Sequence, residues 1–435
     1  MVFPTLYVGN TVTMATSSLR QRLMVGSAAA LLLLGACSSG ESNTKDNASQ
    51  ESTKATTTTS APPREVEQYE GELDGFYAVP DPLPEGEPGE LIRTTEVRRT
   101  DELVTLRVMY HSTDSAGSDR AATGLITYPV AKAPAGGWPV ISTSHGTSGI
   151  ASQCAPSRAD QDAPGWGVEG VWAMTDYIGM GPIGELHPYL SKADEGNAVI
   201  DIVRAARNLK EANASKRWVS VGHSQGGHGA LSAHELAGSY APELELVSTV
   251  SLAPAAMLDR VYGAIDEIVT SILTMMAMYG GQTVQPELAI EDYFSPGALE
   301  ASKGLETNCL DGITTEFIPI AAAGAFSADP RTTEPAKSFI LANDVGGEAV
   351  DGVPLFLASG TIDDRVAIDR FRDLIDKVCD TGQVVELHII EGADHNTVID
   401  QVAPDFVRFI NDSLDGKAPE SSCSKSEEEI TRPMS

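Results

Sequence analysis

The sequence predicts an α/β fold: a mostly parallel central sheet with helices on both faces and one helical insertion. Short β-branched or apolar runs recur along the chain, with helical periodicity between several of them. One such segment, 199–209, places its apolar and charged positions on opposite faces of a helix. Strands that alternate with helices favour parallel pairing, because crossover helices cover the sheet. The predicted strands are 103–110, 122–129, 138–143, 170–176, 218–222, 246–252, 354–358 and 384–390.

The alternation stops between about residues 254 and 352, where we expect a helical cap inserted between two strands. An apolar segment over 258–279 predicts a long helix that ends at a glycine pair, and 286–300 and 317–326 follow it. The Met-rich stretch 272–278 suits either a packed core or a surface that contacts an acyl chain, because Met serves both.

Composition excludes some partners. The chain has 435 residues, of which 42% are apolar, so it can bury a large core. It carries 30 Lys and Arg against 61 Asp and Glu, a formal net charge of -31. Nucleic acids and anionic lipid headgroups require positive charge for attraction, so we expect neither as a partner.

The N-terminus predicts export. Arg20 and Arg22 precede the apolar run 23–34, and small residues lead to Cys37, which together describe a signal peptide over 1–37. The run is shorter than the roughly 20 residues that a membrane-spanning helix needs. Its Leu-Gly-Ala-Cys ending resembles the bacterial lipoprotein signal, which implies that Cys37 carries a lipid anchor at the outer face of the cell membrane. Ordinary secretion is the alternative.

Two polar segments flank the predicted catalytic domain, 67–416. Residues 38–66 are rich in Ser and Thr and almost free of apolar side chains, so we expect a disordered tether. Residues 417–435 are similarly polar and are expected as a C-terminal tail, which Cys423 could pin in part.

Disulfides are expected in an exported chain. Besides Cys37, the sequence has Cys154, Cys309, Cys379 and Cys423, an even number that suggests two bridges. Four cysteines allow three connectivities, and the sequence does not choose between them. We favour Cys154–Cys309 and Cys379–Cys423. No pair has metal-ligand spacing.

The motif Gly-His-Ser-Gln-Gly-Gly over 222–227 carries the predicted chemistry. Gly-x-Ser-x-Gly is typical of a sharp strand-to-helix turn that presents a nucleophilic Ser. Here 217–221 reads as the strand before the turn and 227–237 as the helix after it. We therefore predict Ser224 as the nucleophile, with the backbone N–H of the next residue, Gln225, as one oxyanion donor.

A base must accept the proton of the serine hydroxyl. On this kind of sheet the expected chain order is Ser, then Asp or Glu, then His. His395 lies in the loop after the strand 384–390, which is the expected place. The other histidines precede the candidate acid, apart from His388 inside a strand, and are expected to be structural or exposed.

The acid should follow the preceding strand, 354–358. Asp363 is our choice, ahead of Asp364, which suits a helix cap. Asp394 ranks last, because side chains of adjacent residues such as Asp394 and His395 rarely face each other. The acid would fix the imidazole tautomer and stabilise the imidazolium.

A second oxyanion donor is expected in the loop after an early strand. Residues 144–149, Ser-His-Gly-Thr-Ser-Gly, follow the strand 138–143, and the Thr147 N–H is the predicted donor.

Several motifs together resemble the secretory lipase family, which includes the fungal lipase A type and many actinobacterial esterases. The likeness extends from about Asp74 to Leu414. The motifs are Asp74-Gly75-Phe76-Tyr77, Tyr110-His111-Ser112-Thr113-Asp114, Ser144-His145-Gly146-Thr147, Cys154-Ala155-Pro156-Ser157, Asp176-Tyr177-Ile178-Gly179-Met180-Gly181, His187-Pro188-Tyr189 and the motif over 222–227.

This resemblance implies an α/β-hydrolase fold with a helical cap over the site, and activity on acylglycerols or simpler esters. It carries nucleophile, acid and base onto Ser224, Asp363 and His395, in agreement with the choice from the residues. The fungal members lack a counterpart of Cys37, and the cap is where members differ most. Chain-length preference, and true lipase against plain esterase, therefore stay open. The sequence does not give the oligomeric state either.

The predicted function is that of an exported serine hydrolase of carboxylic esters, a lipase or esterase with no metal or organic cofactor. A peptidase or an acyltransferase would keep the same triad and differ in the cap and in water access. A non-catalytic surface-binding lipoprotein is a further alternative, although such a protein would be expected to lose a triad member.

Overall fold

The structure is a computed structural model that describes residues 65–159, 165–261 and 267–434. Its 11-stranded sheet has the order β1-β2-β3-β4-β6-β5-β7-β8-β9-β10-β11. Pairs from β6 to β11 in this order are parallel, whereas β2, β3, β4 and β6 pair antiparallel. The predicted mostly parallel sheet is confirmed. The strands are β1 (Glu67–Gln68), β2 (Leu91–Arg99), β3 (Leu103–Thr113), β4 (Asp119–Pro129), β5 (Trp138–Ser144), β6 (Val171–Ile178), β7 (Ala214–His223), β8 (Glu245–Leu252), β9 (Leu355–Gly360), β10 (Val385–Glu391) and β11 (Thr431–Pro433).

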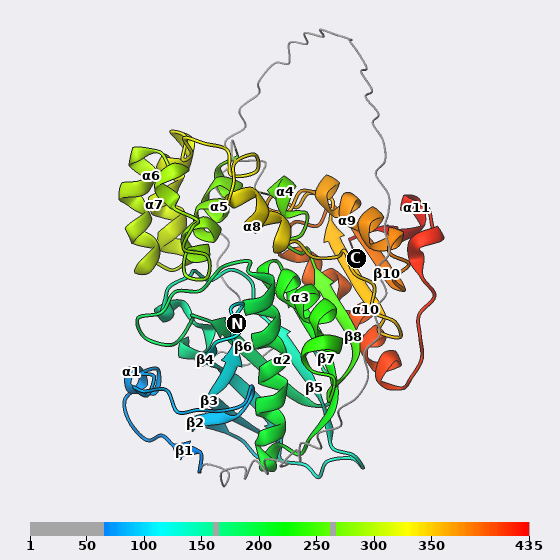
Figure 1. Cartoon of the computed structure of the whole chain (residues 1–435). Helices are drawn as coiled ribbons and strands as arrows, with labels where there is room; N and C mark the ends of the chain where they lie inside the picture. The colour runs from blue at the N-terminus through cyan, green and yellow to red at the C-terminus, as the bar shows by residue number, and fades with distance from the viewer. Residues whose placement is uncertain (1–64, 160–164, 262–266, 435) are drawn as a thin grey trace, which may run out of the picture. The chain divides into compact units, whose positions relative to one another are not determined.

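Helices cover both faces of the sheet (Figure 1). Side chains of a strand alternate between faces, so the neighbours Val140 and Ile141 of β5 enter different cores. Val140 packs in one core with Val199 of α2, and Ile141 packs in the other with Phe406 of α10. The helix predicted over 199–209 corresponds to the second half of α2, which ends one residue earlier, and α10 covers the opposite face of the sheet. The helices around the sheet are α2 (Lys192–Asn208), α3 (Gln225–Tyr240), α9 (Ile368–Asp380) and α10 (Thr397–Leu414), and a short α1 (Leu73–Phe76) precedes β2.

A helical insertion separates β8 from β9, as predicted. Its core includes Ile150, Tyr189 and Ala255, which lie in the loops after β5, β6 and β8. The insertion therefore packs on loops at the carboxyl end of the parallel strands (Figure 1). Its helices are α4 (Leu258–Val261), α5 (Ile268–Gly281), α6 (Pro296–Ala301), α7 (Leu310–Ala322) and α8 (Ala336–Ala342).

The single helix predicted over 258–279 is instead described as α4 and α5. Glu267, directly before α5, has an extended backbone with φ -89° and ψ 130°, so α5 begins anew after it. Met275, Met276 and Met278 are fully buried in the core of the insertion. Of the two roles that the sequence left open for this stretch, these side chains take the packing role.

The C-terminal segment differs from the polar tail predicted over 417–435. It forms α11 (Glu427–Ile430) and then β11, which pairs in parallel with β10. A disulfide joins Cys423 to Cys379 of α9, and Ile430 packs with Phe371 of the same helix. One disulfide and one apolar side chain thus tie a largely polar segment to the sheet.

Both favoured disulfides are present. The Cα atoms of Cys154 and Cys309 are 5.3 Å apart, and those of Cys379 and Cys423 are 5.6 Å apart. The signal peptide predicted over 1–37, with Cys37, and nearly all of the tether predicted over 38–66 lie outside the described residues. Within the described ranges, no helix combines the length and the apolar character needed to span a membrane.

Candidate active site

The turn between β7 and α3 holds Ser224 in an unusual backbone conformation. Ser224 has φ 60° and ψ -121°, and positive φ is uncommon for residues other than glycine. Its N–H donates to Leu252 O at 2.9 Å, which ties the turn to β8. A Cβ on Gly222 would lie 1.8 Å from Gly226 O, and a Cβ on Gly226 would lie 1.9 Å from Ser144 O. The motif therefore needs glycine at both positions for this close packing.

Asp363 and His395 meet at the carboxyl ends of β9 and β10. β9 and β10 are neighbouring parallel strands, so the loops that follow them lie at the same end. The distance from His395 Nδ1 to Asp363 Oδ2 is 2.8 Å, and both residues are buried. The other carboxylate oxygen accepts hydrogen bonds from the N–H groups of Arg365 and Val366, at 2.9 and 2.8 Å. These two N–H groups hold the carboxylate in the orientation in which its second oxygen contacts the imidazole.

This contact sets the tautomer of His395. To donate to a carboxylate, Nδ1 must carry the proton, which leaves Nε2 of the neutral ring as an acceptor. Nε2 is buried and has no hydrogen-bond partner in the part of the chain that the structure describes. An imidazole in this state can accept a proton from a hydroxyl group.

The two alternative acids point elsewhere. Asp364 is exposed. Asp394 accepts hydrogen bonds from the N–H groups of Asn396 and Thr397 at 3.0 and 2.8 Å, at the start of α10. Asp363 is therefore the carboxylate, among the three considered, that accepts a hydrogen bond from the His395 ring.

His223, one of the histidines expected to be structural or exposed, connects the nucleophile turn to the loop of His395. Its Nε2–H donates to the backbone oxygen of His395 at 2.7 Å, and the two ring centroids are 4.6 Å apart. Burial, together with the nearby His395 ring, lowers the pKa of His223 to about 4. His223 directly precedes Ser224, so this neutral ring links the nucleophile turn to the loop of the candidate base. Its position inside the motif was the one signal available in the sequence.

The loop after β5 lies beside the nucleophile turn. β5 pairs with β7, with Ser144 opposite Gly222, so the loops after both strands emerge together. A Cβ on Gly146 would lie 3.8 Å from Ser224 Cβ. The next residue, Thr147, hydrogen-bonds through Oγ1 to the Tyr189 hydroxyl at 2.7 Å. The structure therefore brings the predicted second oxyanion loop to the predicted nucleophile.

Gln225 is the first residue of α3, and its side chain is buried. The first N–H groups of an α-helix have no acceptor within the helix. They also lie at the positive end of the helix dipole, which favours a developing negative charge. The backbone N–H of Gln225 therefore lies at the start of α3, directly after Ser224, and its role as an oxyanion donor stays a prediction.

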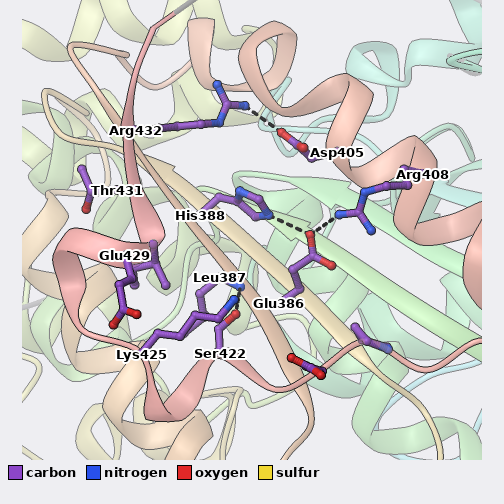
Figure 2. Close-up of a pocket in the computed structure, with 13 residues that line it drawn as sticks. Glu386, Leu387, His388, Asp405, Arg408, Ser422, Lys425, Glu429, Thr431 and Arg432 are labelled. Carbon is purple, nitrogen blue, oxygen red and sulfur yellow. Dashed lines mark hydrogen bonds and ion pairs between the residues drawn. The ribbon is translucent and has the colours of Figure 1, made fainter.

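A separate charged groove of about 510 Å³ lies between β10, α10 and the C-terminal segment (Figure 2). Several of its ionic groups pair with one another: Glu386 accepts a hydrogen bond from His388 at 2.9 Å and pairs with Arg408, and Arg432 pairs with Asp405 at 2.7 Å. None of the three candidate catalytic residues lines it. This groove does not belong to the site around Ser224.

Comparisons with known proteins agree with this fold. A Mycobacterium tuberculosis protein described as a probable inactive lipase is 24% identical over 379 residues, which cover 79% of this chain and 82% of that protein. The closed state of Candida antarctica lipase A has a TM-score of 0.67 at 18% identity, over 79% of this chain and 86% of the other. The rice cell wall degrading esterase LipA of Xanthomonas oryzae has a TM-score of 0.65 at 17% identity, over 76% and 100%. These structures establish an α/β-hydrolase fold.

The secretory lipase family matches residues 165–422, a segment that includes the nucleophile turn, the insertion and the loops with Asp363 and His395. Membership of this family supports an ester hydrolase of the lipase or esterase type. Because the match spans more than half of the 435 residues, the chain belongs to the secretory lipase family.

Proposed function

We propose that this chain is a serine hydrolase that cleaves carboxylic esters, either acylglycerols or simpler esters, through an acyl-enzyme on Ser224. The observation that carries the proposal is the 2.8 Å contact between His395 Nδ1 and Asp363 Oδ2, with the opposite ring nitrogen free to accept a proton. The strained turn at Ser224 and its contact with the His395 loop through His223 support the same assignment.

The reaction proceeds in two acyl-transfer steps. His395 Nε2 takes the hydroxyl proton of Ser224 as Oγ attacks the ester carbonyl carbon. Asp363 stabilises the resulting imidazolium, which then gives the proton to the alcohol as the C–O bond breaks. Water attacks the acyl-enzyme with the same proton transfers in reverse order, and releases the carboxylic acid and free Ser224.

Two backbone N–H groups, from Gln225 and Thr147, stabilise the oxyanion of each tetrahedral intermediate. Such donors act strongly in a site that excludes water, since the charge has no competing solvent. Removal of one donor typically costs about 3 kcal/mol of transition-state stabilisation. The position of Gln225 at the start of α3, and of the Thr147 loop beside it, supports this role.

The relative described as a probable inactive lipase makes a non-catalytic role the principal alternative. This chain retains a serine, a carboxylate and a histidine in the expected order, and its carboxylate and histidine are in contact. Both observations support catalysis. A peptidase or an acyltransferase would use the same groups, and partitioning of the acyl-enzyme between water and added alcohol separates an acyltransferase from a hydrolase.

The test is hydrolysis of p-nitrophenyl esters of increasing chain length by the purified protein and by Ser224→Ala. We expect hydrolysis by the wild type, with a chain-length profile that separates lipase from esterase, and loss of hydrolysis in the variant. A folded wild type that hydrolyses none of the esters, or a variant that keeps its activity, would overturn the proposal.

We also propose that the protein is exported and that Cys37 carries a lipid anchor. Two disulfides are compatible with an oxidising compartment, and the secretory family suggests export. Substitution of Cys37 by Ala should move the protein from the membrane fraction to the medium. An unchanged distribution would contradict the anchor at this residue.

A further inference from the structure

Glu195 of α2 is a buried carboxylate directly behind the nucleophile turn. Its side chain has 0% exposure. One oxygen, Oε2, lies 2.6 Å from His228 Nδ1, and the other, Oε1, accepts from Leu190 N–H at 3.0 Å and from Gln225 Nε2 at 2.9 Å. A buried charge without partners is very costly, so these contacts explain why the carboxylate can remain inside.

The hydrogen bonds assign the protons of His228. His228 contacts two acceptors, Glu195 through Nδ1 and Asn343 O through Nε2 at 2.8 Å, so it donates from both nitrogens and is an imidazolium. Burial opposes both charges, but the attraction within the pair, together with the contact of His187 with Glu195, outweighs it. The pKa of Glu195 is lowered to about 2 and that of His228 is raised, with Asp344 adding to the latter.

His187 also contacts this carboxylate. Its Nδ1 lies 2.9 Å from Ile178 O, and its Nε2 lies 3.3 Å from Glu195 Oε1. Gln225 Nε2 lies 2.8 Å from His187 Nε2 and 2.9 Å from Glu195 Oε1, and the amide donates to the carboxylate. The reversed amide would place its oxygen against the carboxylate, which repels it. The side chain of Gln225 is therefore held in one orientation.

The same carboxylate reaches the second oxyanion loop. Leu190, whose N–H donates to Glu195, has a positive φ of 58°, an uncommon conformation that the hydrogen bond helps to hold. The preceding residue, Tyr189, bonds through its hydroxyl to Thr147 Oγ1 at 2.7 Å. Glu195 is thus connected to the residues of both proposed oxyanion donors, Gln225 and Thr147.

We infer that Glu195 is a positioning residue of the ester hydrolase: it holds Gln225 and the loop 187–190 so that the Gln225 and Thr147 N–H groups face the developing oxyanion. This inference rests on the proposed function. Its carboxylate touches no reacting atom and acts through the side chain of Gln225 and through Tyr189. Misplacement of preorganised donors weakens binding of the transition state more than binding of the substrate.

Asp201 provides a matched control. It lies on the same helix, has 0% exposure, and accepts hydrogen bonds from Ser112 and Tyr240, each at 2.8 Å, and from Arg204 at 2.7 Å. None of these partners belongs to the nucleophile turn or to the loop 187–190. Asp201→Asn and Glu195→Gln therefore remove equivalent buried charges from one helix, but only the second loosens the proposed oxyanion donors.

The experiment measures kcat and KM for a p-nitrophenyl ester, and inhibition by a trifluoromethyl ketone analogue of the tetrahedral intermediate, in wild type, Glu195→Gln and Asp201→Asn. We expect kcat of Glu195→Gln to fall by roughly 10²–10³-fold with KM little changed, because oxyanion stabilisation is lost. Affinity for the ketone should fall in parallel. Asp201→Asn should keep a kcat near that of the wild type.

A second variant guards against misfolding of Glu195→Gln. Gln225→Met keeps the backbone N–H but removes the amide that Glu195 holds, and its kcat should fall while KM stays near the wild-type value. Equal kcat values for the Glu195 and Asp201 variants, or a normal kcat for Gln225→Met, would overturn the positioning role. An inactive wild type would instead overturn the proposed function and the role of Glu195 with it.

Discussion

Replacement of Asp363 by Asn should disable the base while it leaves the loop intact. Asn Oδ1 can still accept from the N–H groups of Arg365 and Val366, which lie 2.9 and 2.8 Å from the native oxygen. The amide nitrogen then takes the place of the oxygen 2.8 Å from His395 Nδ1 and donates to it. His395 would keep its proton on Nε2, the nitrogen that must accept one from Ser224.

The expected loss follows from this wrong tautomer. An acid-to-amide change in a serine triad lowers kcat by about 10⁴-fold. At about 1.36 kcal/mol for each factor of ten, this corresponds to about 5.4 kcal/mol of activation free energy. KM should change little, since the carboxylate binds the imidazole and not the substrate.

The assay compares steady-state hydrolysis of a p-nitrophenyl ester by wild type, Asp363→Asn and Asp364→Asn. Asp364 is the adjacent, exposed carboxylate, so its variant controls for net charge and for the loop. We expect full activity in this control. A kcat of Asp363→Asn within about tenfold of the wild type, or a greater loss in Asp364→Asn, would refute the assignment of the acid.

Two further predictions concern stability. Replacement of both Cys379 and Cys423 by Ser opens a loop with a sequence separation of 44, and the chain-entropy relation predicts a decrease of about 4 kcal/mol in the free energy of unfolding. Denaturant titration measures it, and a loss below about 1 kcal/mol would contradict the relation for this loop. His223 is neutral when folded above about pH 4 but protonates near 6.5 when unfolded, so acidification through this window destabilises the wild type. His223→Gln should therefore lose less unfolding free energy between pH 6.5 and 4, and parallel pH profiles of the two proteins would contradict this.

The central strands of the sheet are predicted well from the sequence because they are short apolar runs. Residues 138–143 and 246–252, for example, correspond to β5 and β8. β2 is missed because it is rich in charged residues, one of which, Arg93, lies at a buried position. Arg93, 8% exposed, donates to the backbone oxygens of Gly75 and Ala78, acceptors that only the folded chain brings to it.

The chain order of Ser224, Asp363 and His395 could be read from the sequence because each follows a predicted strand, and parallel strands bring their carboxyl ends together. The surroundings of these residues could not. Glu195 and His228 are distant from Asp363 and His395 in sequence, and the charge of His228 depends on contacts that form on folding. The same holds for the C-terminal segment, whose position depends on Cys423 and Ile430.

The most direct test of the account is covalent labelling of the intact protein with a fluorophosphonate, followed by peptide mass spectrometry. The reagent reacts with a serine hydroxyl only when a base activates it. We expect one adduct, on Ser224, and none in Ser224→Ala or on other serines. A folded protein without an adduct, or an adduct on a different serine, would contradict the assignment of Ser224 as the activated nucleophile.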